Sequence, residues 1–241
     1  MENKGVNTRF KALEWAEEAS NKTVMIIGAG GIGSWLSLFI ARIGSEIFIF
    51  DGDNVDDTNM SGQHYSIEDV GRNKAELVVQ QGKKFSKNDD IYNFGNYDKD
   101  SPSNEIVFSC LDNMHTRKLA FEKWKDLPDR KLFIDGRMLA ESIQIFAVQK
   151  GQEKAYEKTL FADESVPDLQ CSAKATTHCG ALIASKMTGI FTNFVFNEVL
   201  GEDFREVPFR LYYDIDLMHQ DTDYNTKSRS KIKTKKYEET V

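Results

Sequence analysis

Blocks of apolar and polar residues follow one another in an order typical of alternating strands and helices. An apolar run over 24–27 leads through a short turn into a stretch with helical spacing over 35–43, and a second apolar run covers 46–50. The order repeats further on, with helices predicted over 67–85 and 114–125 and strands over 90–94, 105–110, 131–135 and 142–148. Such alternation predicts an α/β, Rossmann-like fold with a mostly parallel sheet and helices on both faces.

The C-terminal third departs from this order. Residues 142–148 alternate in a way that indicates an antiparallel or edge strand, the polar segment 150–170 predicts a crossover over the sheet, and 209–216 predicts a last strand. Between them an apolar helical stretch runs from Cys171 to Leu200 and is expected to be one helix or two divided at Gly189. From His219 onward basic and small polar residues alternate, so we predict one domain over 1–218 and a flexible polar, basic tail over 219–241.

Composition narrows the class of protein. A chain of 241 residues with 40% hydrophobic content can bury one large core, and a formal net charge of -7 gives no support for a nucleic acid or anionic membrane as partner. Polar residues interrupt the longest apolar stretches, which predicts neither a signal peptide nor a spanning helix. The three cysteines lack C-x-x-C spacing, so we expect no structural zinc and no disulfide framework, and a cytoplasmic location.

A glycine-rich turn stands between the first strand and the first long helix. Gly28, Gly30 and Gly33 have the spacing G-x-G-x-x-G, and the next strand ends at Asp51, where a carboxylate can hold a ribose hydroxyl. Glycines let the backbone approach a ligand closely, and the amino end of the helix attracts an anion. The turn therefore predicts nucleotide binding but leaves NAD, FAD and ATP open.

Two further features lie at the same predicted edge of the sheet. The polar connection over 52–65 is long for a compact domain, and such loops are usually functional or disordered. Asp112 is a second carboxylate directly after a strand. Carboxyl ends of parallel strands meet at one edge, where open α/β sheets bind ligands.

Taken together, five ordered motifs in the first half of the chain resemble the ThiF and ubiquitin-activating superfamily. They are 28–34 with its glycines, Asp51 with Asp53, Asn59 with Gln63, the segment 69–75 that contains Lys74, and Leu111-Asp112-Asn113 with Arg117. The resemblance implies ATP- and magnesium-dependent adenylation of the C-terminal carboxylate of a small ubiquitin-like or sulfur-carrier-type (β-grasp) protein.

The resemblance also implies residue roles. Gly28, Gly30, Gly31 and Gly33 would cradle phosphates, Asp51 would hold the ribose, Asn59 and Lys74 would contact the triphosphate, and Asp112 would organise magnesium, with Asp53, Gln63, Leu111 and Asn113 as further nucleotide-binding residues. Arg9 matches a family arginine that reaches into the partner subunit's site, which implies a homodimer.

One position departs from the family pattern. The family loop reads Asn-Leu-x-Arg-Gln, whereas this chain has Gly62 where the arginine stands. We expect either that Arg72, Arg117 or Arg9 of the partner subunit supplies the missing charge or that catalysis is weakened.

A covalent second step depends on a cysteine. Cys171 with Lys174, followed by His178 and Cys179, is similar to the thioester-forming region of one branch of the family. A thiolate at a helix amino end beside a lysine is favoured, but Cys171 as an ordinary loop thiol and Cys179 as a core residue remain equally open. Cys110, at the end of an apolar strand, is expected in the core.

The sequence leaves other functions open besides adenylation of a protein carboxylate. A catalytically impaired scaffold that binds a ubiquitin-like partner would explain Gly62, and an NAD-dependent oxidoreductase would use the same glycine turn. An adenylating enzyme that acts on a nucleotide or tRNA also remains open.

Overall fold

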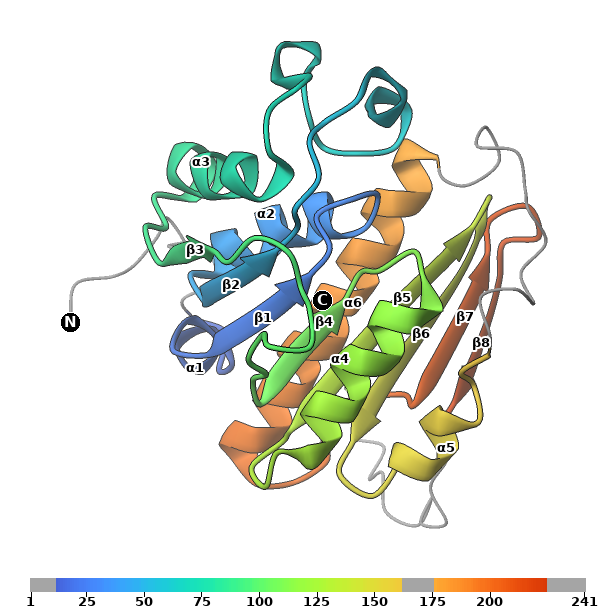
Figure 1. Ribbon diagram of the computed structural model, residues 1–241. Coiled ribbons are helices and arrows are strands. Elements are labelled where there is room, and N and C mark those ends of the chain that lie inside the picture. The colour runs from blue at the N-terminus through green and yellow to red at the C-terminus, as the bar shows by residue number, and fades with distance from the viewer. Residues whose placement is uncertain (1–11, 162–175, 225–241) are drawn as a thin grey trace, which may run out of the picture.

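A single eight-stranded sheet forms the centre of the protein, whose computed structural model describes residues 12–161 and 176–224 (Figure 1). The strands are β1 (Thr23–Ile27), β2 (Glu46–Phe50), β3 (Ile91–Asn93), β4 (Ile106–Ser109), β5 (Leu132–Leu139), β6 (Ser142–Gln149), β7 (Arg210–Asp214) and β8 (His219–Asp223). Their order across the sheet is β3-β2-β1-β4-β5-β6-β7-β8. The first five strands in this order, β3, β2, β1, β4 and β5, run parallel to one another. β6, β7 and β8 pair antiparallel with their neighbours. The predicted fold class is confirmed.

Helices cover both faces of this sheet (Figure 1). They are α1 (Ala16–Ser20), α2 (Gly33–Ile43), α3 (Lys74–Ser86), α4 (Met114–Asp126), α5 (Glu153–Glu157) and α6 (Thr177–Leu200), with short 3-10 turns η1 (Asp57–Ser61) and η2 (Ile67–Asp69). α2, α3 and α6 pack on one face, and α4 and α5 on the other. Because both faces are covered, every position of β4 is buried, and β1 is buried from Val24 onward.

The long apolar stretch forms one continuous helix through Gly189. α6 ends at Leu200 because Gly201 takes a left-handed conformation with φ 69°. By length and composition α6 could cross a membrane, but 56% of its most apolar window is buried inside the protein, against α2, β5 and β6. We therefore interpret it as the core helix of the domain. The helix was expected to begin at Cys171; the described part begins at Thr177, and 162–175 lie outside it.

Two predicted boundaries were wrong. The tail was expected from His219, but 219–223 form strand β8, which pairs with β7 and carries the folded domain to Asp223. β8 is an exposed edge strand, so its polar residues gave no apolar signal. The helix predicted over 67–85 is split, because Gly71 has φ 85° and Asn73 caps the amino end of α3 by accepting from the Glu76 amide.

The two strands that neighbour β1 in the sheet, β2 and β4, lie on opposite sides of it. The chain passes first to β2 on one side and later to β4 on the other, so the segments that follow β1 and β4 diverge at the carboxyl edge. This is the topological switch point, where open α/β sheets leave a crevice for a ligand. The glycine turn follows β1, and Leu111-Asp112-Asn113 follows β4.

Candidate nucleotide-binding site

The glycine turn has two tight positions and one open position. Gly28 has φ 96°, and a Cβ there would lie 2.6 Å from the carbonyl oxygen of Cys110. A Cβ on Gly33 would lie 1.8 Å from the carbonyl oxygen of Gly28. By contrast, the nearest atom to a Cβ on Gly30 is Nε2 of Gln63, at 3.9 Å. The protein's own packing therefore requires Gly28 and Gly33, whereas Gly30 borders space that a ligand can occupy.

Asp51, at the end of β2, holds the glycine turn in place. Its Oδ2 accepts from the amide of Ala29 (2.7 Å) and its Oδ1 from the amide of Asp53 (2.8 Å). Burial raises the pKa of this carboxyl above its ordinary value, although the two backbone bonds and Lys74 act in the opposite direction. Each oxygen keeps a second acceptor position, so the predicted contact with a ribose hydroxyl is compatible with these bonds.

Lys74 is the first residue of α3, which begins at the same edge of the sheet. Its side chain is only 9% exposed, and its Nζ lies 3.3 Å from Oδ2 of Asp53, which is 78% exposed. Nδ2 of Asn73 donates to the carbonyl of Asp53 (3.2 Å) and so fixes the segment after β2 against α3. A buried ammonium needs an anionic partner, and a phosphate can take the place of the exposed Asp53 carboxylate in that role.

The loop that contains η1 lies beside the turn and is tied to two helices. Nε1 of Trp35 in α2 donates to the carbonyl of Gly62 (3.2 Å), and the hydroxyl of Thr177 in α6 donates to the carbonyl of Ser61. Asn59 uses its Oδ1 to close a capping box with the amide of Asp56 (3.0 Å). The contact of Asn59 with a triphosphate stays a prediction, to which its amide nitrogen would contribute.

Gln63 follows in this loop and carries an unsatisfied group. Its Oε1 is buried and has no hydrogen-bond partner in the described protein, and its Nε2 lies near Gly30. A buried acceptor without a partner costs about 1–3 kcal/mol unless something donates to it. A ligand over Gly30 would be in reach of this side chain.

The turn after β4 completes the edge. Asn113 caps α4 by accepting from the amide of Thr116 (2.9 Å), and its Nδ2 donates to Oδ1 of Asp112 (3.3 Å). Asp112 is exposed, whereas the carbonyl of Leu111 accepts from the guanidinium of Arg117. The carboxylate of Asp112 is thus presented to solvent on an ordered backbone.

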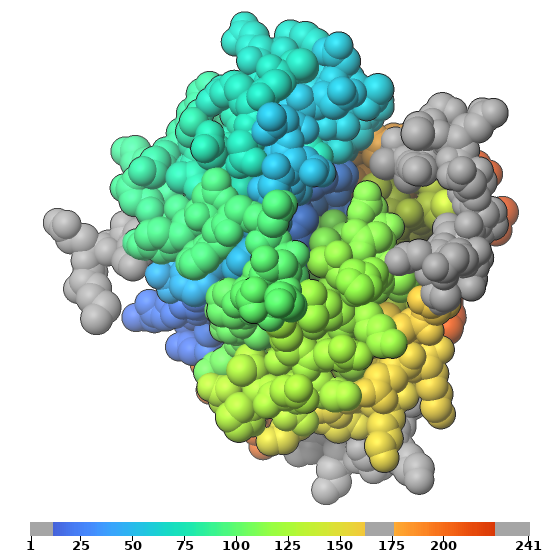
Figure 2. All heavy atoms as spheres, viewed as in Figure 1, coloured from blue at the N-terminus to red at the C-terminus, as the bar shows by residue number. Residues whose placement is uncertain are grey.

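These pieces meet at the switch point. Cys110 at the end of β4 packs on Gly28, and Asp51 binds Ala29, so both neighbouring strand ends contact the turn after β1. In the space-filling view the surface is hollowed between the cyan segment after β2 and the green segment after β4, with blue atoms of the first part of the chain at the bottom (Figure 2). Asp51 and Asp53, the latter paired with Lys74, belong to the segment after β2, and Asp112 belongs to the segment after β4, so these side chains come from the two segments that border the hollow.

Two predicted catalytic residues lie outside the described residues. They are Arg9 and Cys171. Among the described residues no group of three or more His, Cys, Asp or Glu side chains is arranged to hold a metal. A magnesium ion whose other ligands are water and phosphate oxygens needs only one protein carboxylate, so Asp112 as its ligand stays a prediction.

Two of the three arginines considered as substitutes for the missing loop arginine are engaged elsewhere. Arg117 is buried and donates through Nε to Oδ1 of Asp135 (2.7 Å), so it cannot turn to the loop. Arg72 pairs with Asp69 (2.9 Å) and also donates to Gln80. Gly62, where the family has arginine, is buried beneath Trp35 and the start of α6.

The two described cysteines lie in the core. Cys110 and Cys179 are buried, and burial raises the pKa of both thiols, that of Cys179 to about 11. Their burial confirms the core interpretation of both. His178 is exposed and contacts Oε1 of Glu141 (3.2 Å).

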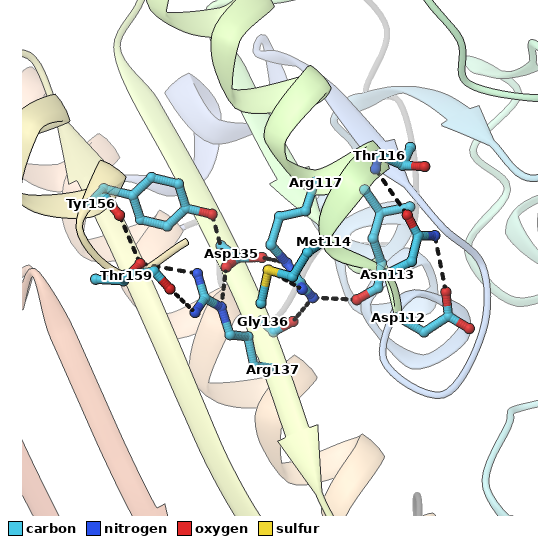
Figure 3. A network of polar contacts seen from close by, with 11 residues as sticks. Asp112, Asn113, Met114, Thr116, Arg117, Asp135, Gly136, Arg137, Tyr156 and Thr159 are labelled. Carbon is cyan, nitrogen blue, oxygen red and sulfur yellow. Dashed lines mark hydrogen bonds and ion pairs between the residues drawn. The ribbon is translucent and has the colours of Figure 1, made fainter. Parts of the chain in front are cut away.

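Sequence reasoning missed a buried polar network beside the site (Figure 3). Asp135 in β5 is fully buried and accepts from Arg117, from Nε of Arg137 (2.7 Å) and from the hydroxyl of Tyr156 (2.9 Å). Burial raises the pKa of Tyr156 well above its ordinary value, and the charge of Asp135 adds to the effect. The signal was present in the sequence, since Asp135-Gly136-Arg137 places two charges inside an apolar strand.

Comparison with known proteins identifies the family. A family model described as "ThiF family" matches residues 6–231. The chain belongs to the ThiF family. Among curated proteins, it is 39% identical over 67 residues to a tRNA threonylcarbamoyladenosine dehydratase of Bacillus subtilis and 26% identical over 128 residues to ubiquitin-like modifier-activating enzyme 5 of Culex quinquefasciatus. These matches cover 27% and 45% of this chain but only 26% and 32% of the two relatives.

Solved structures of the same fold cover more of the chain. A crystal structure of E. coli MccB with ATP superposes with a TM-score of 0.65 at 18% identity, covering 88% of this chain and 66% of MccB. PaaA superposes with a TM-score of 0.62 at 17% identity, covering 87% of this chain and 75% of PaaA. At these identities the likeness shows the fold alone, a Rossmann-like domain of the ThiF type.

Proposed function

We propose that this protein uses ATP and magnesium to adenylate a carboxylate, and that the carboxylate is the C-terminus of a small ubiquitin-like or sulfur-carrier-type protein. The observation that carries the proposal is that the open position at Gly30, the ammonium of Lys74 paired with Asp53, and the exposed carboxylate of Asp112 belong to segments that follow β1, β2 and β4 at the switch point of the sheet. Membership of the ThiF family and the ATP-bound neighbour MccB support the choice of ATP over NAD.

In the proposed reaction the substrate carboxylate attacks the α-phosphorus of ATP and pyrophosphate leaves. Two anions must approach each other, so the barrier falls when fixed cations and backbone amides neutralise charge and hold the groups in line. The glycine turn presents its amides and the amino end of α2 to phosphate oxygens. The ammonium of Lys74 would turn from the Asp53 carboxylate to a phosphate oxygen. A ribose hydroxyl would donate to the unsatisfied Oε1 of Gln63.

Magnesium fits the donor set on this edge. When bound, it would add a divalent charge beside the phosphates, with Asp112 as the protein's ligand. No side-chain nucleophile is needed for this step. In the same proposal Arg9 of a partner subunit supplies the cation that Gly62 does not, and the active form is a homodimer.

The nature of the carboxylate has the least support. One relative is named for activating ubiquitin-like modifiers and another for acting on tRNA, and each shares only part of its length with this chain. We favour the protein carboxylate because the formal net charge of -7 disfavours a polyanionic substrate.

The decisive assay is ATP–pyrophosphate exchange with a candidate β-grasp protein that ends in an exposed glycine. We expect exchange that requires both magnesium and the partner, and that is lost in Asp112→Asn. Exchange with tRNA in place of the protein would support the tRNA-type alternative. Absence of exchange with every partner would contradict adenylation.

A thioester on Cys171 is a second, separable step of the proposal. Cys171→Ala should leave pyrophosphate exchange intact and abolish a conjugate that thiols can cleave. A conjugate that persists in Cys171→Ala would exclude this cysteine as the acceptor.

A second candidate function is a scaffold that binds the partner without turnover. It is favoured by Gly62, because a buried glycine stands where the family has a phosphate-binding arginine. Stable binding of the partner together with no exchange at saturating magnesium would select it.

A further inference from the structure

The carboxylate of Asp135 joins three chain segments at the border of the site. It lies fully buried in β5 and accepts from Nε of Arg117 (2.7 Å), Nε of Arg137 (2.7 Å) and the hydroxyl of Tyr156 (2.9 Å). Two guanidinium groups and one carboxylate leave a net positive charge in a buried position. Removing water from such groups is expensive, and apolar side chains of similar size are often as stable.

One arm of the network reaches the turn after β4. Arg117 in α4 uses Nε for Asp135, while its Nη2 donates to the carbonyl of Leu111 (Figure 3). Leu111 directly precedes Asp112, the exposed carboxylate of the proposed magnesium site. The guanidinium therefore bridges the buried Asp135 and the backbone that carries Asp112.

The other arm runs away from the site. Arg137 donates to the carbonyl and the hydroxyl of Thr159 (2.9 and 3.1 Å) just after α5, and its guanidinium lies 4.6 Å from the ring centre of Phe146. This arm anchors Arg137 and leaves Asp135 little freedom to move. The restraint on Asp135 is thereby passed through Arg117 to the Leu111 carbonyl.

We propose that Asp135 is a positioning residue for Asp112, acting through Arg117 to fix the turn after β4 in the orientation that magnesium requires. This inference rests on the proposed adenylation, for which Asp112 is the metal ligand. Replacing a residue that orients a metal ligand, without touching the metal itself, commonly lowers metal affinity 10- to 100-fold.

The test uses Asp135→Asn, which keeps the shape of the side chain but removes its charge. We expect the magnesium concentration for half-maximal pyrophosphate exchange to rise about 10- to 100-fold, with a smaller change in the KM for ATP. In the free protein, amide hydrogen exchange at Asp112 and Asn113 should become faster, because a neutral amide oxygen holds the guanidinium of Arg117 less strongly than a carboxylate does.

The matched control is Glu153→Gln, on the same face of the sheet. Glu153 pairs with Arg130 (2.7 Å) and is partly buried, and within the described part of the chain it makes no hydrogen bond to the turn after β4. We expect its magnesium requirement and the amide exchange of that turn to match the wild type. If Asp135→Asn fails to fold, Arg117→Lys tests the same bridge, because lysine keeps the charge but cannot span both acceptors.

The outcomes separate the inference from the proposed function. An unchanged magnesium requirement in Asp135→Asn, with or without faster amide exchange, would overturn the positioning role. A wild-type protein without magnesium-dependent exchange would refute the proposed function instead, and amide exchange alone would then decide whether Asp135 orders the turn.

Discussion

Replacing Gly30 with alanine separates the folding role of the glycine turn from its proposed binding role. Gly30 does not have positive φ, and a Cβ there meets no atom closer than 3.9 Å. A glycine-to-alanine change at a compatible position alters the free energy of unfolding by about 0.4–1 kcal/mol in the stabilising direction. Gly30→Ala should therefore fold as well as the wild type.

The same methyl group should impair nucleotide binding. It would occupy the space where a phosphate is proposed to approach the backbone, and so displace at least one hydrogen bond to a charged oxygen. Such bonds contribute about 1.5–3 kcal/mol, which corresponds to a loss of affinity of about 10- to 150-fold. Isothermal titration calorimetry with Mg·ATP measures the loss, and urea denaturation measures stability.

Two further variants serve as controls. Gly33→Ala places a Cβ 1.8 Å from the carbonyl oxygen of Gly28, so it should lose about 1–3 kcal/mol or more of stability as well as binding. At Gly189 in α6, a new Cβ would meet no atom within 4 Å outside its own stretch of helix. Gly189→Ala should therefore lower neither the stability of the protein nor its affinity for Mg·ATP. A folded Gly30→Ala protein that binds Mg·ATP with wild-type affinity would refute the placement of phosphates on the turn.

Three other predictions follow from individual side chains. Burial raises the pKa of Cys179 to about 11, so iodoacetamide at pH 7.5 should leave this thiol unmodified in the native protein, as peptide mass spectrometry would show; rapid alkylation would contradict its burial. Burial, and secondarily Arg42, lowers the pKa of His64 below 6.5, so the unfolded chain takes up a proton at a higher pH than the folded protein does. The free energy of unfolding should therefore fall as the pH drops below about 6.5. Denaturation curves should show a smaller fall for His64→Gln, and an identical fall would refute the assignment to His64. Tyr65→Phe loses the hydrogen bond from the hydroxyl to the carbonyl of Ala29 (2.7 Å) and should cost about 0.5–1.5 kcal/mol of stability by urea denaturation, whereas no loss would show that this bond does not hold the turn.

Apolar periodicity was sufficient to predict the central elements. β1, β2 and α4 are buried segments whose apolar residues follow the period of their element, and their bounds agree with the prediction to within a residue or two. β8 was missed because an exposed edge strand needs no apolar residues and is held by backbone pairing to β7. Local patterning carries no record of that pairing.

The site was predictable where a motif dictates local backbone and not where contacts are long-range. The turn at Gly28 and the ends of β2 and β4 follow from strand order, so Asp51 binds the turn as expected, and Cys110, two residues before Asp112, packs on Gly28. The network around Asp135 joins residues far apart in the sequence, and no spacing rule relates Arg117 to Tyr156. For the same reason the sequence could not show that Arg117 is unavailable to replace a loop arginine.

The central claim is that a magnesium-bound triphosphate lies over the glycine turn, and a crystal structure with Mg²⁺ and a non-hydrolysable ATP analogue tests it most directly. We predict phosphate oxygens within hydrogen-bond distance of the backbone amides around Gly30, the ammonium of Lys74 turned from Asp53 toward phosphate, and the metal ion beside Asp112. A nucleotide bound elsewhere, or phosphates that contact none of these three groups, would contradict the account.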